Sequence, residues 1–207
     1  MRIFDRQMAK KGFAHTWYLY PLGAIVISAI WAASFYLYHQ PSAHQRLSLF
    51  FGANVAKESF IDDLKNRFDR EELQRVDLSY AAKDNALYYS KLRIAVSQAD
   101  LLILDQETLE SFQTHTPESF LPFDDALKRD YLSSPSYYAY DQKDYGALLK
   151  EAGVASSYDS AVLFDPDRSY YLVVSAASKN IGSYLNEDNQ AYTNALRMAR
   201  YLLEGAR

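Results

Sequence analysis

Residues 99–104 read Ala-Asp-Leu-Leu-Ile-Leu, and Asp105 follows them. A short run that is apolar at nearly every position is typical of a strand with both faces covered, as in the centre of a parallel sheet. Asp105 is a common type of helix N-cap, so we expect it to begin a helical turn over residues 106–112. This stretch predicts the central strand of an α/β domain.

Two shorter strands are expected upstream of this run. Residues 47–51, Leu-Ser-Leu-Phe-Phe, form a short apolar run that ends at Gly52, a turn residue. Residues 76–80, Val-Asp-Leu-Ser-Tyr, alternate between apolar and polar positions, which favours a strand with one buried face.

A helix is expected after each of these two strands. Asn54 could cap the first helix, whose apolar stripe recurs every four residues at Phe60, Leu64 and Phe68. Asp84 or Asn85 is expected to open the second helix, on which Tyr88, Leu92 and Ala95 share one face. The resulting β-α-β-α-β order predicts a three-layer α/β domain with a mostly parallel sheet and right-handed crossovers.

The remainder of the domain is expected to complete this sheet. Residues 116–146 suggest a loop, a short helix and an edge strand, and residues 161–164 and 170–174 suggest a β-hairpin around the turn at 165–168. A last helix is expected over residues 187–203, with a buried face formed by Tyr192, Leu196, Ala199 and Leu203. The buried centre is expected to include Phe50, Leu102, Leu104 and Val173.

The N-terminal region predicts a membrane anchor. No Asp, Glu, Lys or Arg occurs between Lys11 and Arg46. Residues 17–38 would rise about 33 Å as a helix, enough to cross a hydrocarbon core of about 30 Å. Aromatic rings at both ends fit the two headgroup interfaces, and the membrane-interface residues are Trp17, Tyr18, Tyr20, Tyr36 and Tyr38.

The charges beside this segment predict its orientation. Residues 1–16 hold four basic residues and one acidic residue, so we expect a cytoplasmic tail, a transmembrane helix at 17–38, a linker at 39–46 and an extracytoplasmic domain at 47–207. A cleaved signal peptide is the alternative, but the apolar run is long for one. The absence of cysteine suits a bacterial cell membrane protein better than a eukaryotic secreted one.

The composition argues against several functions. Residues 39–207 contain 18 of the 22 basic residues and 25 of the 26 acidic ones, and so acidic a surface disfavours nucleic acid as a partner. The four histidines have no metal-ligand spacing, and no phosphate-binding, nucleophile-elbow or zinc-protease motif occurs. We therefore expect no catalytic residues, no metal and no cofactor.

Three segments, in order, carry a family resemblance: LSLFFGANV, YYSKLRIAVSQADLLILDQETLESF and FLPFDDAL. Over residues 47–127 the chain resembles the first lobe of bacterial extracellular solute-binding proteins, the receptors of ABC importers. In that family the strand matching ADLLILD delivers a loop to the ligand cleft. The chain departs from the family because it has room for one lobe only and carries an apolar helix instead of a lipoprotein cysteine.

The resemblance implies a binding edge where the strands end. Its residues would be Gly52, Asn54, Ser79, Tyr80 and Asp105, although each also has an ordinary structural explanation as a turn, cap or strand residue. Tyr137, Tyr138 and Tyr140 are a second set of candidates, because exposed aromatic side chains are enriched at protein interfaces. A small aromatic core under a loop is the alternative for these tyrosines.

Two functional hypotheses follow. The first is a non-enzymatic, membrane-anchored accessory subunit that docks on an integral membrane protein, such as subunits of an ABC transporter. The alternative is a small-ligand receptor or sensor that uses the single solute-binding-like lobe. An enzyme ranks third because no catalytic motif occurs.

Overall fold

The computed structural model describes residues 19–40, 45–57, 59–68, 72–178, 180–181 and 190–205. The chain divides into two compact units, residues 1–40 and residues 41–207. The described part of the first unit is a single helix, α2 (Leu19–Tyr38). Trp17 and Tyr18, two of the expected interface residues, lie outside the described residues.

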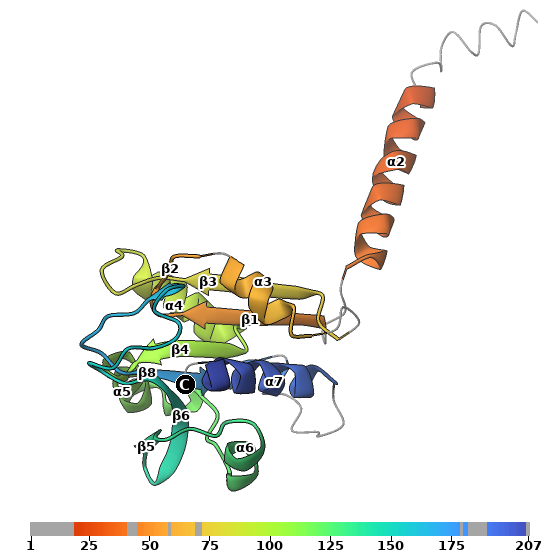
Figure 1. The fold of residues 1–207 in the computed structure, drawn as a ribbon. Helices are drawn as coiled ribbons and strands as arrows, with labels where there is room; N and C mark the ends of the chain where they lie inside the picture. Colours follow the sequence, from red (N-terminus) through yellow and green to blue (C-terminus); the bar gives the residue numbers. More distant parts are fainter. Residues whose placement is uncertain are drawn as a thin grey trace, which may run out of the picture. The chain divides into compact units, whose positions relative to one another are not determined.

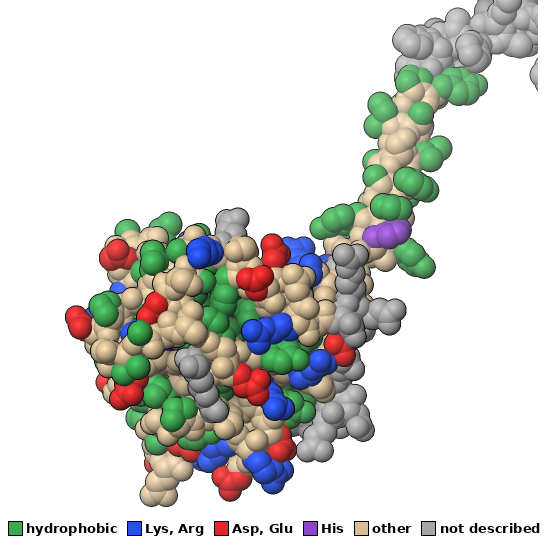
Figure 2. All heavy atoms as spheres, in the orientation of Figure 1, with side chains coloured by type: hydrophobic (Ala, Val, Ile, Leu, Met, Phe, Trp, Pro, Cys, Tyr) green, Lys and Arg blue, Asp and Glu red, His purple; other side chains and the backbone are tan. Residues whose placement is uncertain are grey.

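Helix α2 is apolar on every side. None of its side chains is buried, and Tyr20, Tyr36 and Tyr38 are exposed. Figure 2 shows hydrophobic side chains along the whole visible length of this helix. Its 20 residues make it long and apolar enough to cross a membrane, and an N-terminal signal sequence would meet the same criteria.

The second unit is built on one six-stranded sheet (Figure 1). Its strands, in spatial order, are β3 (Arg75–Tyr80), β1 (Arg46–Phe51), β4 (Leu101–Asp105), β8 (Tyr170–Val174), β6 (Lys143–Lys150) and β5 (Tyr137–Tyr140). Strands β3, β1 and β4 are parallel neighbours. Strand β8 is antiparallel to both β4 and β6, so β6 runs in the same direction as the first three. The expected mostly parallel sheet is confirmed in this sense.

Helices cover both faces of the sheet, which confirms the three layers (Figure 1). Helices α3 (Ser59–Lys65) and α7 (Gln190–Gly205) pack on one face, whereas α4 (Tyr88–Gln98) and α5 (Gln106–His115) pack on the other. Crossovers of the same hand produce this arrangement because the chain moves from β1 to β3 in one direction and from β3 to β4 in the other.

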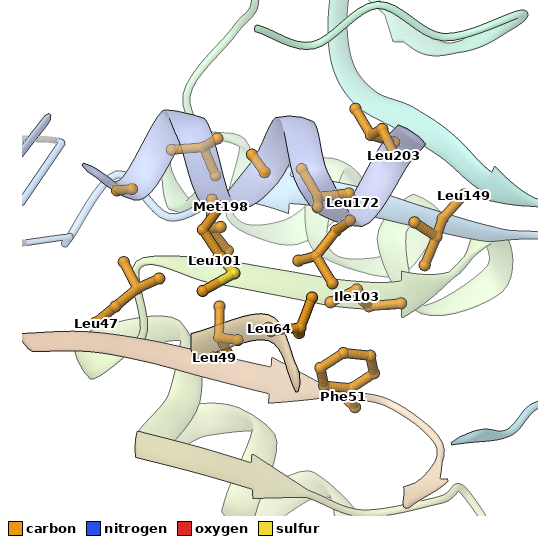
Figure 3. Close-up of a cluster of buried hydrophobic side chains, with 14 of the residues drawn as sticks. Leu47, Leu49, Phe51, Leu64, Leu101, Ile103, Leu149, Leu172, Met198 and Leu203 are labelled. Carbon is orange, nitrogen blue, oxygen red and sulfur yellow. The ribbon is translucent and has the colours of Figure 1, made fainter. Parts of the chain in front are cut away.

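The core follows the alternation of side chains along the strands. In β4, Leu101 and Ile103 face α3 and α7, and Leu102 and Leu104 face α4 and α5. Figure 3 shows Met198 and Leu203 of α7 packed over the first of these faces. The four residues expected at the centre are fully buried, which confirms the core prediction: Phe50, Leu102, Leu104 and Val173.

The expected hairpin of residues 161–164 and 170–174 is wrong. Strand β7 (Val162–Leu163) pairs with β2 (Asn54–Val55) in a separate two-stranded sheet, and β8 pairs with β4 and β6. The turn at 165–168 does form, since the N–H of Asp167 donates to Oδ1 of Asp165 at 3.0 Å. The apolar side chains of β8 are buried on both faces of the main sheet. A hairpin with β7, which has only two residues, could not bury them.

Two helix starts also differ from expectation. Asn54 belongs to β2 and does not cap α3, which begins at Ser59. Helix α4 begins at Tyr88 rather than at Asp84 or Asn85, because the Asn85 side chain accepts the N–H of Leu87 and holds a turn there. The described part of the last helix, α7, buries the four expected residues.

Between α5 and β8 the chain forms two short helices and a hairpin. The helices are a 3₁₀ turn, η2 (Pro117–Ser119), and α6 (Asp125–Asp130). Strands β5 and β6 are joined by Asp141 and Gln142, which both have positive φ, as in a two-residue type I′ turn. The expected short helix and edge strand of residues 116–146 are confirmed, with β5 at the edge of the sheet.

Candidate functional site

The candidate site lies at the carboxyl ends of β1 and β4. These strands are parallel neighbours, yet the chain leaves β1 toward β3 on one side, and β4 lies on the other. Helices α3 and α4 therefore leave on opposite faces of the sheet. Such a switch point opens a crevice at the carboxyl ends of the strands, where open α/β sheets bind ligands.

A cleft of about 400 Å³ occupies this position. We call it the carboxyl-end cleft. Four segments that are distant in sequence line it, namely the end of β1, the turn after β3, the end of β4 and the β7–β8 connection. Its lining residues are Gly52, Asn54, Ala82, Lys83, Asp84, Asp105, Leu163, Phe164, Asp165, Arg168 and Tyr170.

Gly52 lets β1 approach β4 closely at the base of the cleft. Its N–H donates to the carbonyl oxygen of Ile103 at 2.7 Å. A Cβ at position 52 would lie 3.0 Å from that same oxygen, and a backbone oxygen has little freedom to move away. A side chain here would force β1 and β4 apart at the point where the cleft begins.

Asp105 is the fixed carboxylate of the site. Its side chain is 2% exposed and caps α5, accepting the N–H of Thr108 at 3.1 Å and the Thr108 hydroxyl at 2.8 Å. Its Oδ1 lies 2.9 Å from Nζ of Lys83 and 3.4 Å from Nη1 of Arg168. The expected cap at Asp105 is confirmed, and the carboxylate also forms ion pairs with Lys83 and Arg168, which lie on distant segments.

The same two cations bind a second carboxylate, that of Glu107. One oxygen, Oε2, lies 2.9 Å from Nζ of Lys83 and 2.7 Å from Nη1 of Arg168. These hydrogen bonds, first from Lys83 and then from Arg168, hold the pKa of the Glu107 carboxyl below its ordinary value. The bond to Glu107 is the main cause that raises the pKa of Arg168.

Arg168 is oriented by the turn that carries it. Its Nε donates to Oδ2 of Asp165 at 3.0 Å, within the turn at 165–168. The resulting charge cluster contains Lys83, Asp105, Glu107, Asp165 and Arg168. It joins the turn after β3, the start of α5 and the β7–β8 connection.

A second cavity, of about 560 Å³, adjoins the cleft. Asp105, Asp165 and Arg168 border both cavities, whereas Lys83 borders only the carboxyl-end cleft and Glu107 only the second cavity. The ion pairs of the charge cluster therefore form part of the wall between the two cavities.

Below Asp105, a buried chain of hydroxyl groups supports the cluster. The Tyr88 hydroxyl lies 3.1 Å from that of Thr108, which donates to Asp105. Tyr88 is fully buried, and burial raises the pKa of its phenol. The neutral phenol and hydroxyl fix Asp105 in one orientation, so that its Oδ1 faces the two cations.

The groups that this site offers are charged side chains and hydrogen-bond donors and acceptors. Arginine and lysine supply several donors each, and the carboxylates supply acceptors that are already paired with them. No group of three or more His, Asp or Glu side chains suited to hold a metal ion occurs in the described part of the chain. The arrangement can recognise a ligand by charge and hydrogen bonds.

The structure brings together three of the five residues expected at the strand ends. Gly52, Asn54 and Asp105 line the carboxyl-end cleft. Ser79 and Tyr80 do not line it. The hydroxyl of Ser79 donates to the carbonyl oxygen of Leu49 at 3.4 Å, and the half-exposed Tyr80 ring lies 6.0 Å from Nζ of Lys91.

The candidate tyrosines lie on β5, at the opposite edge of the sheet from β3. The hydroxyl of Tyr137 donates to the carbonyl oxygen of Leu132 at 2.9 Å, and the ring of Tyr138 packs edge-on against Tyr171. Tyr140 is 37% exposed. The first two tyrosines hold the β5 edge together, which agrees with the alternative of a small aromatic cluster.

Sequence reasoning missed Lys83, Glu107 and Arg168. Arg168 lies in the turn of the expected hairpin, and no sequence signal connected that turn with Asp105. The pairing of β4 with β8 brings these residues together, because Asp105 lies opposite Tyr170 in the register. The position of Glu107 in the first turn of α5, beside Asp105, is a signal that could have marked it.

Comparisons with known proteins found no match among family models, curated proteins or solved structures.

Proposed function

We propose that this chain is a non-enzymatic, membrane-anchored protein whose extracytoplasmic domain binds a small polar ligand in the carboxyl-end cleft. The observation that carries the proposal is the cleft itself. It occupies the switch point of the sheet, and its volume lies in the range of small-molecule sites, about 300–1,000 Å³.

The lining of the cleft favours a polar ligand. Lys83 and Arg168 keep 23% and 35% of their side chains exposed, so each retains contact with solvent beside its ion pairs. Gly52 and Asn54 add backbone and amide groups. A single lobe leaves much of a ligand's surface uncovered, so we expect weak binding, with a dissociation constant on the order of 0.1–10 mM.

A ligand screen on the full-length chain in lipid nanodiscs tests this proposal. Small polar compounds that raise the thermal unfolding midpoint should lose their effect in Ala82→Trp, which fills the lining of the cleft. The matched control is Ala126→Trp, on the exposed surface of α6. Loss of stabilisation in both variants, or in neither, would contradict binding in the cleft.

The membrane anchor rests on the length and apolar composition of α2 and on the basic residues before it. We propose a cytoplasmic N-terminus with the domain on the outer side of a bacterial cell membrane. Protease added to intact cells should digest the domain and leave the N-terminal tail protected. Protection of the domain would reverse the orientation, and release of a soluble chain lacking α2 would indicate a signal sequence.

A second candidate function is an accessory subunit that docks on an integral membrane protein, such as a transporter. Exposed apolar side chains on and directly before α4 favour it, since Tyr89 and Ile94 of α4 are 69% and 56% exposed and Leu87, its N-cap residue, is 59% exposed. A photo-crosslinking amino acid at position 89 should capture one defined membrane protein. The same group at position 126 on α6 serves as the control, and equal capture at both positions would contradict a docking role for α4.

A relationship to one lobe of the solute-binding proteins fits both candidates. The three parallel strands β3, β1 and β4 carry their following loops to one edge of the sheet, as the resemblance implies. The chain would then have kept the ligand edge of such a lobe and replaced a soluble or lipid-linked form with α2.

A further inference from the structure

The two cations of the charge cluster are bound by two carboxylates that differ greatly in exposure. Asp105 is 2% exposed and is held by Thr108, whereas the side chain of Glu107 is 72% exposed. Both carboxylates contact Lys83 Nζ and Arg168 Nη1. Asp105 therefore fixes the cations from below, and Glu107 covers them from the solvent side.

An exposed carboxylate can leave this position without breaking the fold. Exposed ion pairs contribute little to stability, and the described contacts of the Glu107 carboxylate are the two cations. If Glu107 turned toward solvent, Lys83 Nζ and Arg168 Nη1 would present their donors to the same point in space, where one oxygen of Glu107 now lies. Two cations that converge on one anionic oxygen form an anion-binding position, and we call the position between Lys83 Nζ and Arg168 Nη1 the anion seat.

We infer that the ligand of this cleft carries a carboxylate, and that Glu107 occupies the ligand's place in the free protein. The inference rests on the proposed binding function and names its ligand class. Exchange of Glu107 for a ligand carboxylate leaves the charge of the site unchanged. The exchange would also remove the Glu107 carboxylate from the lining of the second cavity.

Glu107 is then an internal competitor that weakens binding. The apparent affinity of a site falls by the fraction of molecules in which the site is free. Two exposed ion pairs leave the seat free in about one molecule in ten. Removal of the Glu107 charge should therefore raise the affinity for a carboxylate roughly tenfold.

Saturation-transfer NMR with succinate as the probe tests this on the full-length chain in nanodiscs. Glu107→Gln should bind succinate roughly tenfold more tightly than the unaltered chain, and Glu107→Gln combined with Arg168→Gln should lose the gain. Glu110→Gln is the matched control, since Glu110 borders the same second cavity one turn along α5 and has no ion pair among the described contacts. It should change the affinity by less than about twofold, because among the described contacts Glu110 has no ion pair with Lys83 or Arg168.

The outcomes separate this inference from the proposed function. Equal gains in Glu107→Gln and Glu110→Gln would overturn the inference, because general repulsion rather than an occupied seat would explain them. Absence of succinate binding in Glu107→Gln would also overturn it, and stabilisation by an uncharged compound that Ala82→Trp abolishes would then leave the binding function standing. Circular dichroism on each variant confirms that it is folded.

Discussion

Replacing Asp105 with alanine should measure how much the charge cluster contributes to the stability of the domain. The substitution removes two things at once: the cap of α5 and the buried carboxylate that binds Lys83 and Arg168. Loss of an N-cap typically costs about 1 kcal/mol. Leaving two cations without a buried partner can cost about 3–5 kcal/mol, although this applies when they are fully buried.

The remaining exposure of the cations lowers that second figure. Lys83 and Arg168 are 23% and 35% exposed and keep Glu107 as a partner, so about 1–2 kcal/mol is the appropriate share. Asp105→Ala should therefore destabilise the domain by about 2–3 kcal/mol. For a domain of this size the thermal midpoint should fall by roughly 5–10 °C.

Asp124→Ala provides a control for the cap alone. Asp124 caps α6 by accepting the N–H of Leu127 at 2.7 Å, and its side chain is exposed. Its replacement should cost about 1 kcal/mol. If Asp105→Ala lowers the midpoint no further than Asp124→Ala does, the charge cluster does not stabilise the fold.

The assay should follow tyrosine signals in near-ultraviolet circular dichroism. The only two tryptophans, Trp17 and Trp31, precede the domain, whereas most of the 18 tyrosines lie within it. Tryptophan fluorescence would report on the N-terminal unit, and far-ultraviolet dichroism would include the signal of α2. Tyrosine dichroism therefore reports the unfolding of the domain itself.

Three other substitutions test separate parts of the fold. Burial raises the pKa of the Asp100 carboxyl above its ordinary value of 3.8, so the contribution of its protonated form to the free energy of unfolding should fall as pH rises from 3.8 to the raised pKa. Asp100→Asn should remove this pH-dependent contribution from urea titrations across pH 3–7. The same pH dependence in the variant and in the unaltered chain would contradict the raised pKa. Gln142→Gly should stabilise the domain by about 0.5–1 kcal/mol, because a non-glycine residue at a φ of 62° is strained, and an unchanged or lower thermal midpoint would count against the turn. Leu102→Asp should prevent folding, because an unpaired buried carboxylate costs several kcal/mol. The control Leu163→Asp, at a 58% exposed position, should fold. A protease-resistant Leu102→Asp domain would refute the central position of β4.

Short sequence patterns were sufficient to predict those helices and strands whose burial follows from the spacing of their own apolar residues. The apolar run of β4 indicated a strand covered on both faces, and Leu102 and Leu104 are fully buried there. The four-residue spacing of Phe60 and Leu64 correctly indicated the buried side of α3. In these segments the side chains needed for burial also favour the observed backbone, so sequence and structure agree.

Pattern failed where pairing partners were distant in the chain. Strands β7 and β8 are close in sequence and read as a hairpin, yet β8 has more apolar surface to bury than two-residue β7 could cover. The candidate site could be predicted only in part for the same reason, because it too depends on pairing between distant strands. Gly52 and Asp105 could be placed at one edge from strand order, but Arg168 joins them through a β4–β8 pairing that no short-range signal predicts.

The insertion of β8 between β4 and β6 has a consequence for the order in which the domain can fold. Residues 101–105 of β4 are buried at every position, but their antiparallel neighbour, residues 170–174, is made some 65 residues later. Until then β4 has a bare hydrophobic edge, and β5 and β6 have no strand through which to join the first half of the domain. Such long-range pairing makes folding slow and exposes the nascent chain to aggregation. Chains truncated before residue 170 should therefore stay sensitive to protease, whereas chains extended through α7 should become resistant in a single step.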